Sequence, residues 1–277
     1  MSRIVELTSQ WWQLKKRFGI EPADELKYNL AENHPTRGRL DANGWTQAQR
    51  VPEMLKKIAE LDVTILANTL VDHRGGRSTC DLYVDTFKWC VRRFANHIEF
   101  DLRRPPGPHA VVVDMPPVPR DPSDRSDRSD RSLSQRLQAL LENPGTAPFD
   151  AYAEMYAEAE MFVQRGSSGT PLRDLDFVPT LLAAHAKHAD LLQITDVIAS
   201  AMNEFCAHNL NRSANGPRSR SSYPDDNFQI LAPRIRADSR QERIRGYGFD
   251  VFPGSDGVEA LLARAEELRQ QAVADAG

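Results

Sequence analysis

The segment at residues 190–202 constrains the fold of this chain most, because its spacing predicts a buried helix with a single central acid. Apolar residues recur along it at helical spacing, while Gln193 and Asp196 lie about one turn apart on another face. An isolated carboxylate in an apolar helix is costly unless it is paired, hydrogen-bonded or bound to a cation. Asp196 is therefore the first candidate for chemistry, and the alternative is a helix whose polar edge meets solvent.

Length and charge limit the class of protein. With 277 residues, of which 40% are hydrophobic, the chain can form one large domain or two small ones around a real core. The net charge is −4, from 35 basic and 39 acidic side chains. This balance argues against a globally basic protein that coats nucleic acid and leaves room only for a local basic patch.

Cysteine usage and hydropathy predict a cytoplasmic protein. The three cysteines are odd in number and lack the spacing of a zinc site, so we expect reduced thiols. No apolar run reaches the roughly 18 residues that a membrane span needs. The N-terminus lacks the apolar core of a secretion signal. We therefore expect no membrane partner.

Strands and helices are predicted in alternation. Apolar, β-branched runs at 63–71 and 110–114 predict buried strands, which end at Asp72 and Asp114. A short strand is predicted at 176–178. Helices are expected at 3–18, 51–61, 81–99, 132–142, 150–164, 190–208 and 256–272, and mostly irregular structure at 22–52, 211–226 and 227–252.

A low-complexity insert occupies about residues 121–132. The tripeptide Ser-Asp-Arg occurs there three times in succession, from Ser123 to Arg131. Alternating opposite charges with serine offer no apolar face to bury, so a flexible surface loop is predicted. The alternative is an RNA-binding segment, which the aspartates weaken because they cancel the arginine charges.

Acids at element ends suggest a cation site. Asp114 and Asp196 are predicted on separate rigid elements, and such carboxylates can converge on Mg²⁺ or Mn²⁺. Asp72 is a further candidate, unless it is a solvated turn residue. Lys27 could bind a phosphate oxygen, although a plain surface lysine is the alternative. The arginines at 234–245 could likewise meet nucleic-acid phosphate or form a solvated face.

Six short motifs follow one another along residues 3–253. They are ELK at 25–27, LVDH at 70–73, LY at 82–83, VVDM at 112–115, LQITD at 192–196 and GYGFDVFP at 246–253. Their order resembles that of the domain of unknown function 3800 family, a bacterial and phage family placed among ribonuclease H-like folds. The LQITD helix, which is similar to the LQLAD helix of that family, is the most specific of the six.

The resemblance implies an α/β fold with a ribonuclease H-like mixed sheet flanked by helices. It implies that Asp114 and Asp196 are metal ligands and that Lys27 lies near the substrate. Gln193 would orient Asp196 or line the site, with Glu25 and Asp72 as accessory residues. The implied activity is divalent-metal-dependent cleavage of a phosphodiester, with Mg²⁺ or Mn²⁺ as cofactor and nucleic acid as partner, and this step is an analogy of fold.

The chain also departs from that family. The Asp-Glu-Ser-Gly signature of the first strand is absent, and the first two strands are apparently missing. In the implied strand order 3-2-1-4-5, the strands at 63–71 and 110–114 would then lack the partners between them. Met115 replaces the usual acidic neighbour of Asp114. A misassigned start, a degenerate family member or strands supplied by a partner would each explain this.

These observations lead to one domain prediction and three functional hypotheses. A ribonuclease H-like domain is expected at 1–210, an irregular extension packed on it at 211–253, and an amphipathic terminal helix at 254–277. The first hypothesis is a metal-dependent nuclease that uses Asp114, Asp196 and Lys27. The alternatives are a catalytically inactive protein that binds nucleic acid or protein, and a structural protein assembled through its terminal helix.

Overall fold

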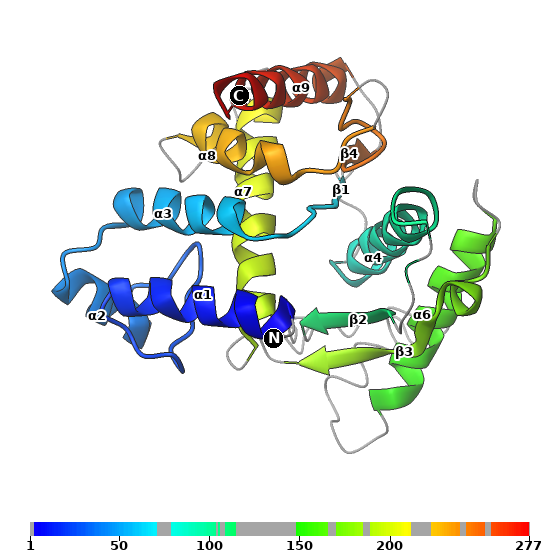
Figure 1. Ribbon diagram of the computed structural model, residues 1–277, viewed down its shortest axis with the longest axis horizontal. Coiled ribbons are helices and arrows are strands. Elements are labelled where there is room, and N and C mark those ends of the chain that lie inside the picture. The colour runs from blue at the N-terminus through cyan, green and yellow to red at the C-terminus, as the bar shows by residue number, and fades with distance from the viewer. Residues whose placement is uncertain are drawn as a thin grey trace, which may run out of the picture. The chain divides into compact units, whose positions relative to one another are not determined.

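The computed structural model describes much of the chain, and its residues form two compact units (Figure 1). Unit 1 is Met1–Thr69 with His185–Gly277, and unit 2 is Leu70–Ala184. This division differs from the boundaries expected at 210 and 253, which stay predictions. The described residues are 3–70, 79–103, 105, 109–114, 148–165, 170–184, 189–211, 223–238, 242–252 and 256–276.

Unit 1 is built around one long helix, α7, which spans Asp190–Asn211. Four helices pack across it along its length, as Figure 1 shows for α1, α3, α8 and α9. The strands β1 and β4 form a two-stranded sheet beside them. The bounds are α1 Arg3–Arg17, α2 Pro35–Ala42, α3 Gln47–Glu60, β1 Ala67–Leu70, α8 Pro224–Leu231, the 3₁₀ turn Ala232–Arg234, β4 Phe249–Phe252 and α9 Asp256–Ala276.

The helix termini follow from local capping groups. Gly19, at φ +72°, follows the end of α1 in the left-handed region that favours glycine. Thr46 and Gln49 form a reciprocal capping box, which starts α3 four residues before the predicted position. The predicted loop at 22–52 also contains α2, whose first turn is capped by the His34 side chain. The prediction of a loop was wrong at α2. The helix has too few apolar residues to show a helical pattern in the sequence, and its start is marked by the His34 cap.

The core of unit 1 includes a segment that was expected to be irregular. Phe228 on α8 stacks on Phe205 of α7 at 4.1 Å between ring centroids. Phe249 on β4 meets Phe228 edge-on at 5.6 Å. All three rings are completely buried. The prediction of irregular structure at 227–252 was therefore wrong at both ends of that segment.

Unit 2 combines a parallel strand pair with helices. β2 and β3 pair in parallel, with Val111 opposite Leu181 and Asp114 opposite Ala184. Helix α6 packs on β3 and on α4, and a π-helical turn continues α4. The bounds are α4 Thr79–Asn96, the π turn His97–Asp101, β2 His109–Asp114, α6 Pro148–Gln164, the 3₁₀ turn Leu172–Leu175 and β3 Phe177–Ala184.

Both predicted strands find partners within the chain. The strand expected at 63–71 is shorter, at Ala67–Leu70, and pairs with β4, while β2 pairs with β3. The expectation that these strands go unpaired was therefore wrong, because a later segment pairs with each of them in a two-stranded sheet. The general α/β class is confirmed, and the ribonuclease H-like arrangement stays a prediction.

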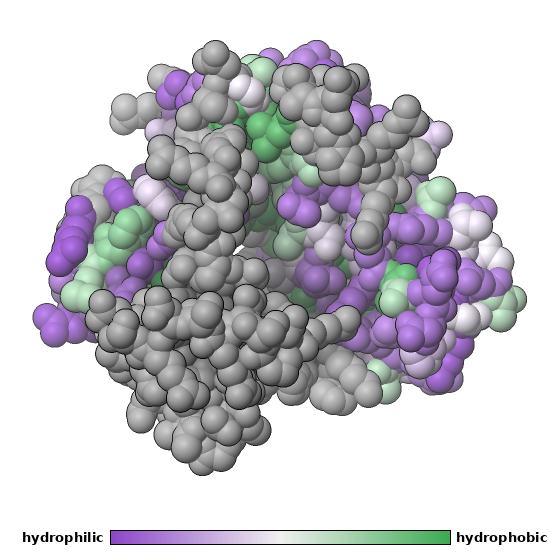
Figure 2. All heavy atoms as spheres, turned by 180° about the vertical axis from the view of Figure 1, so that it is seen from behind, coloured by the Kyte–Doolittle hydropathy of each residue, from purple (hydrophilic) through white to green (hydrophobic). Residues whose placement is uncertain are grey.

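Other predictions concern the surface and the parts of the chain without described structure. Hydrophilic residues make up most of the described surface on the face seen in Figure 2, and hydrophobic residues show as small patches.

Of the helices that are described, none combines the length and the apolar character that a membrane crossing requires. The insert at about 121–132, the helix predicted at 132–142 and Asp72 lie outside the described residues.

Candidate functional site

The predicted site residues fall in two parts of the chain. Asp196 lies half-buried on α7, and Gln193 lies almost fully buried one turn before it, both in unit 1. Glu25 and Lys27 belong to the same unit, in the irregular segment before α2. Asp114 is the last residue of β2 in unit 2, and its side chain lies outside the described part of the structure. Four of the predicted residues therefore belong to unit 1.

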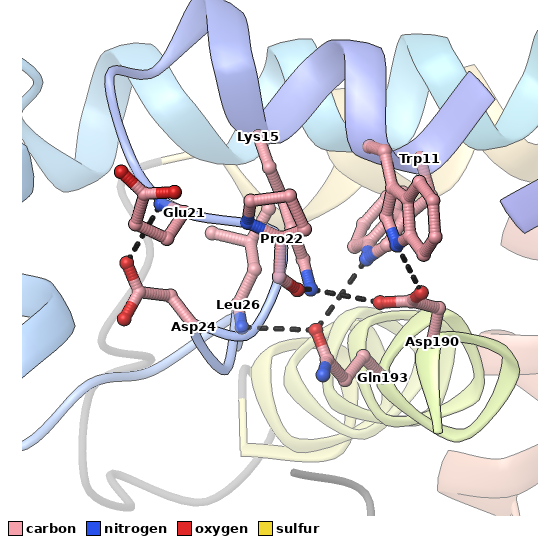
Figure 3. A network of polar contacts seen from close by, with 9 residues as sticks. Trp11, Lys15, Glu21, Pro22, Asp24, Leu26, Asp190 and Gln193 are labelled. Atoms are coloured by element: carbon pink, nitrogen blue, oxygen red, sulfur yellow. Dashed lines mark hydrogen bonds and ion pairs between the residues drawn. The ribbon is translucent and has the colours of Figure 1, made fainter. Parts of the chain in front are cut away.

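One hydrogen bond joins the two motifs of this site. The backbone N–H of Leu26 donates to Gln193 Oε1 at 3.0 Å, and Trp11 Nε1 donates to the same oxygen at 3.4 Å (Figure 3). The segments at 25–27 and 192–196 are thus in direct contact, although 167 residues separate the two bonded groups. Gln193 is 1% exposed, so this amide oxygen meets its hydrogen-bonding need inside the protein.

The side chains around Leu26 alternate between the core and the surface. Leu26 and Tyr28 are completely buried, whereas the side chains of Glu25 and Lys27 retain 15% and 36% of their exposure. Lys27 Nζ lies 3.0 Å from Glu25 Oε1, and His34 Nε2 lies 3.6 Å from Glu25 Oε2. The backbone that Leu26 anchors to α7 therefore carries a paired glutamate and lysine whose side chains stay partly exposed.

A buried ion pair fixes the start of α7. Lys15 Nζ donates to Asp190 Oδ1 at 2.7 Å and to the carbonyl oxygen of Pro22 at 2.8 Å. Trp12 Nε1 donates to the other Asp190 oxygen at 2.6 Å. Figure 3 shows Lys15 of α1 between Asp190 and the turn at Pro22, with a contact to each. The carboxylate also lies in the first turn of α7, where the helix dipole favours a negative charge.

A second buried network holds the other end of the segment. Tyr28 donates from its hydroxyl to Glu204 Oε2 at 3.1 Å and accepts from Asn227 Nδ2 at 2.9 Å. The Arg50 guanidinium donates to the carbonyl oxygens of Lys27 and Tyr28. Burial lowers the pKa of Arg50 to about 10, which leaves it charged at neutral pH. The backbone at 26–28 is therefore held from α3 and α7, and the Tyr28 side chain from α7 and α8.

Most of the arginines considered for nucleic-acid binding have internal partners. Arg234 Nε donates to the carbonyl oxygen of Ala59 at 2.6 Å, and Arg236 lies over the Tyr247 ring at 5.5 Å. Arg245 makes two hydrogen bonds to Glu259, at 2.6 and 2.5 Å. These three arginines therefore form neither a uniformly solvated face nor a row of side chains that is open to phosphate. Arg240 lies outside the described residues.

The carboxylates that were predicted to bind a metal are only partly described. Among the described residues, no group of three or more His, Cys, Asp or Glu residues is arranged to hold a metal ion. The Asp196 carboxylate is a hard oxygen donor of the kind that Mg²⁺ and Mn²⁺ prefer.

No protein-family model, curated protein or solved structure matches the chain.

The residues that position the site were not identified from the sequence. Lys15, Asp190, Tyr28 and Glu204 all form contacts across more than 170 residues of sequence. One signal existed for Lys15, which lies on the apolar face of its helix, four residues after Trp11 and three before Phe18. A lysine on that face needs a buried partner, but the spacing does not identify which acid supplies it.

Proposed function

We propose that this protein is a ribonuclease H-like, divalent-metal-dependent phosphodiesterase that acts on nucleic acid. The observation that carries the proposal is the hydrogen bond from Leu26 N to Gln193 Oε1, at 3.0 Å. It brings together the two motifs that the family resemblance assigns to one site. Lys27 and Asp196, from these two motifs, are the residues to which we assign direct roles.

Each residue of the site has a distinct role in this proposal. The Asp196 carboxylate holds the cation, and the Lys27 ammonium binds a phosphate oxygen as a point charge. Gln193 positions the segment at 25–27, since its Oε1 accepts hydrogen bonds from Leu26 and Trp11. The bound Mg²⁺ or Mn²⁺ would activate water and stabilise the leaving oxygen. The resemblance also implies a metal-ligand role for Asp114, at the end of β2 in unit 2, and this residue is tested by its own variant.

The test is metal-dependent cleavage by the wild-type protein and by Asp196→Asn. Labelled single-stranded DNA, double-stranded DNA and RNA are incubated with Mg²⁺, Mn²⁺ or EDTA. We expect cleavage of at least one substrate with metal and its loss in Asp196→Asn and Asp114→Asn. The matched control is Asp226→Asn, an exposed acid on α8 of the same unit. Equal cleavage by Asp196→Asn and the wild type, or none by either, would contradict the proposal.

A non-catalytic member of the same class is the second candidate. It is favoured by the contact between Lys27 and Glu25, because an internal acid at 3.0 Å competes with substrate phosphate for the ammonium. This candidate predicts binding of nucleic acid or protein without turnover, and nucleic-acid binding would weaken steeply with salt. Binding of labelled strands that is unchanged in Asp196→Asn, with no cleavage in Mg²⁺ or Mn²⁺, would establish the nucleic-acid form.

A further inference from the structure

A pocket of about 340 Å³ in unit 1 is lined by residues of β4, of the segment before it and of the first turns of α9. Its floor is apolar and includes Phe252, Val258 and Leu262. Its rim is charged and includes Arg243 and Asp250. The volume is within the range of small-ligand sites, and an apolar floor with a few polar groups is their usual composition.

The walls of this pocket are fixed by hydrogen bonds. Glu266 Oε1 accepts from the backbone N–H groups of Ile244 and Arg245, at 2.8 and 3.0 Å. The Arg245–Glu259 pair belongs to the lining and joins the segment before β4 to α9. Gly246 turns the chain at φ +75° and donates to the carbonyl oxygen of Phe249 at 3.2 Å. The site is therefore formed before any ligand binds, which reduces the entropic cost of binding.

Arg243 is the group available for an anion. It is exposed, and no hydrogen bond or ion pair of its guanidinium occurs among the described residues. Arginine binds phosphate oxygens through two parallel N–H groups. Val258, in the floor, belongs to the first turn of α9, and the dipole of this long helix adds positive potential there.

The remaining groups fit a nucleoside. Phe252 is the aromatic residue of the lining, and Val258 and Leu262 of α9 line the pocket with it, so a base would meet an aromatic and apolar surface. Asp250 Oδ1 accepts from the backbone N–H of Val251 at 3.0 Å, and a carboxylate has further lone pairs that suit a sugar hydroxyl or a base amino group. The four charged side chains of the pocket, two arginines and two acids, balance to zero. A single phosphodiester charge suits this balance better than a polyphosphate.

We propose that this pocket binds one nucleotide unit, with its phosphate on Arg243 and its base against Phe252. The assignment rests on the nucleic-acid partner of the proposed function, but not on catalysis. The shared chemistry is a nucleoside phosphate, which is either a free nucleotide or part of a single strand. In the strand case the pocket is an anchor separate from the cleavage chemistry assigned to Asp196.

The experiment measures binding of a fluorescein-labelled 12-nucleotide single strand at several salt concentrations. Variants of the full chain are Arg243→Ala, Phe252→Leu and the control Arg173→Ala, an exposed arginine of unit 2. We expect Arg243→Ala to weaken binding about tenfold and to reduce the slope of log K against log salt by about 0.7. Phe252→Leu should weaken it about fivefold at an unchanged slope, because only the ring is lost. Melting curves check that each variant is folded.

Competition with unlabelled nucleoside monophosphate and with deoxyribose phosphate separates the two sources. Displacement by the monophosphate alone at micromolar concentration assigns the pocket to free nucleotides. Displacement only by unlabelled strand assigns it to a nucleotide within a strand. The proposal is overturned if the wild type binds neither ligand, or if both pocket variants bind within twofold of it. Cleavage by Arg243→Ala with metal is scored separately, so a failure of the nuclease assignment is not mistaken for a failure of the pocket.

Discussion

Lys15 and Asp190 form an ion pair of 2.7 Å in which the lysine side chain is completely shielded from water. The pair connects α1 to the first turn of α7, and its lysine also binds the Pro22 carbonyl oxygen. Desolvation of two charges offsets much of their attraction, so a pair of this kind contributes more to one specific arrangement than to net stability. Here the arrangement is the approach of the segment at 22–28 to α7.

Lys15→Met should destabilise the fold, because it leaves Asp190 without its cationic partner. Removal of one member of a buried pair typically costs about 3–5 kcal/mol. Urea denaturation measures this loss, and Lys15→Met/Asp190→Asn should recover part of it, because the uncompensated charge is gone. The matched control is Lys16→Met, an exposed neighbour on the same helix. If the free energy of unfolding of Lys15→Met lies within about 0.5 kcal/mol of the wild-type value, the pair is not a structural anchor.

Gln193→Leu should loosen the segment at 25–28 without unfolding the unit. The substitution keeps the side-chain size but removes the acceptor of the Leu26 N–H group, at a cost of about 1–3 kcal/mol. Hydrogen exchange of the Leu26 amide is the direct readout, and it should become faster while amides in the middle of α9 keep their protection. Gln271→Leu, on the exposed side of α9, should change neither. Unchanged exchange at Leu26 would mean that Gln193 does not hold the segment.

The sequence predicted those elements in which apolar residues recur regularly along the whole helix or strand. The helices at α1, α7 and α9 begin and end within a few residues of the prediction. The strand β2 was also expected, because four β-branched and small apolar residues precede Asp114. The predicted strand at 176–178 was too short. Its continuation to Ala184 depends on pairing with β2, a non-local contact that no local pattern contains.

The sequence predicted individual residues of the candidate site but not the contacts between its segments. Motif order identified Lys27, Gln193 and Asp196 as residues of interest. The contact that joins their two motifs is made by Leu26, whose backbone N–H carries no sequence signal. The anchors Lys15 and Tyr28 were missed for a related reason, since each meets a partner far along the chain. Packing of α1 and α8 against α7 determines these contacts, so they follow from the tertiary fold alone.

Phe249→Ala should destabilise unit 1 strongly. The ring is completely buried and contacts Phe228 at 5.6 Å, in a segment that the sequence did not assign to the core. Deletion of such a side chain leaves a cavity and typically costs about 3–5 kcal/mol. Phe100→Ala is the control, because that ring is 57% exposed in unit 2 and its loss should cost less than about 0.5 kcal/mol. Similar denaturation midpoints for the two variants would argue against the aromatic core.

Lys27→Met should separate a functional role from a structural one. The lysine is partly exposed, so loss of its pair with Glu25 should cost no more than about 1 kcal/mol. If Lys27 binds substrate phosphate, nucleic-acid cleavage should fall about tenfold, since a charge-assisted contact is lost. Lys27→Arg should restore part of the activity, because it restores the charge. A variant with full activity and full stability would identify Lys27 as an ordinary surface lysine.

The Cys206 thiol should make the folded state sensitive to alkaline pH. Burial raises the pKa of Cys206 from about 9 to about 12, and the hydrogen bond with Thr69 opposes this only weakly. The unfolded chain releases the thiol proton near pH 9 while the folded protein keeps it, so stability is full below pH 9 and declines towards pH 12. Thermal melting of wild type and Cys206→Ala from pH 8 to 10.5 measures the effect, and the melting temperature of the variant should decline less.

The burial of Cys206 also predicts that a thiol reagent modifies it at pH 8 only after denaturant is added. Rapid labelling of Cys206 in the native protein would contradict this prediction.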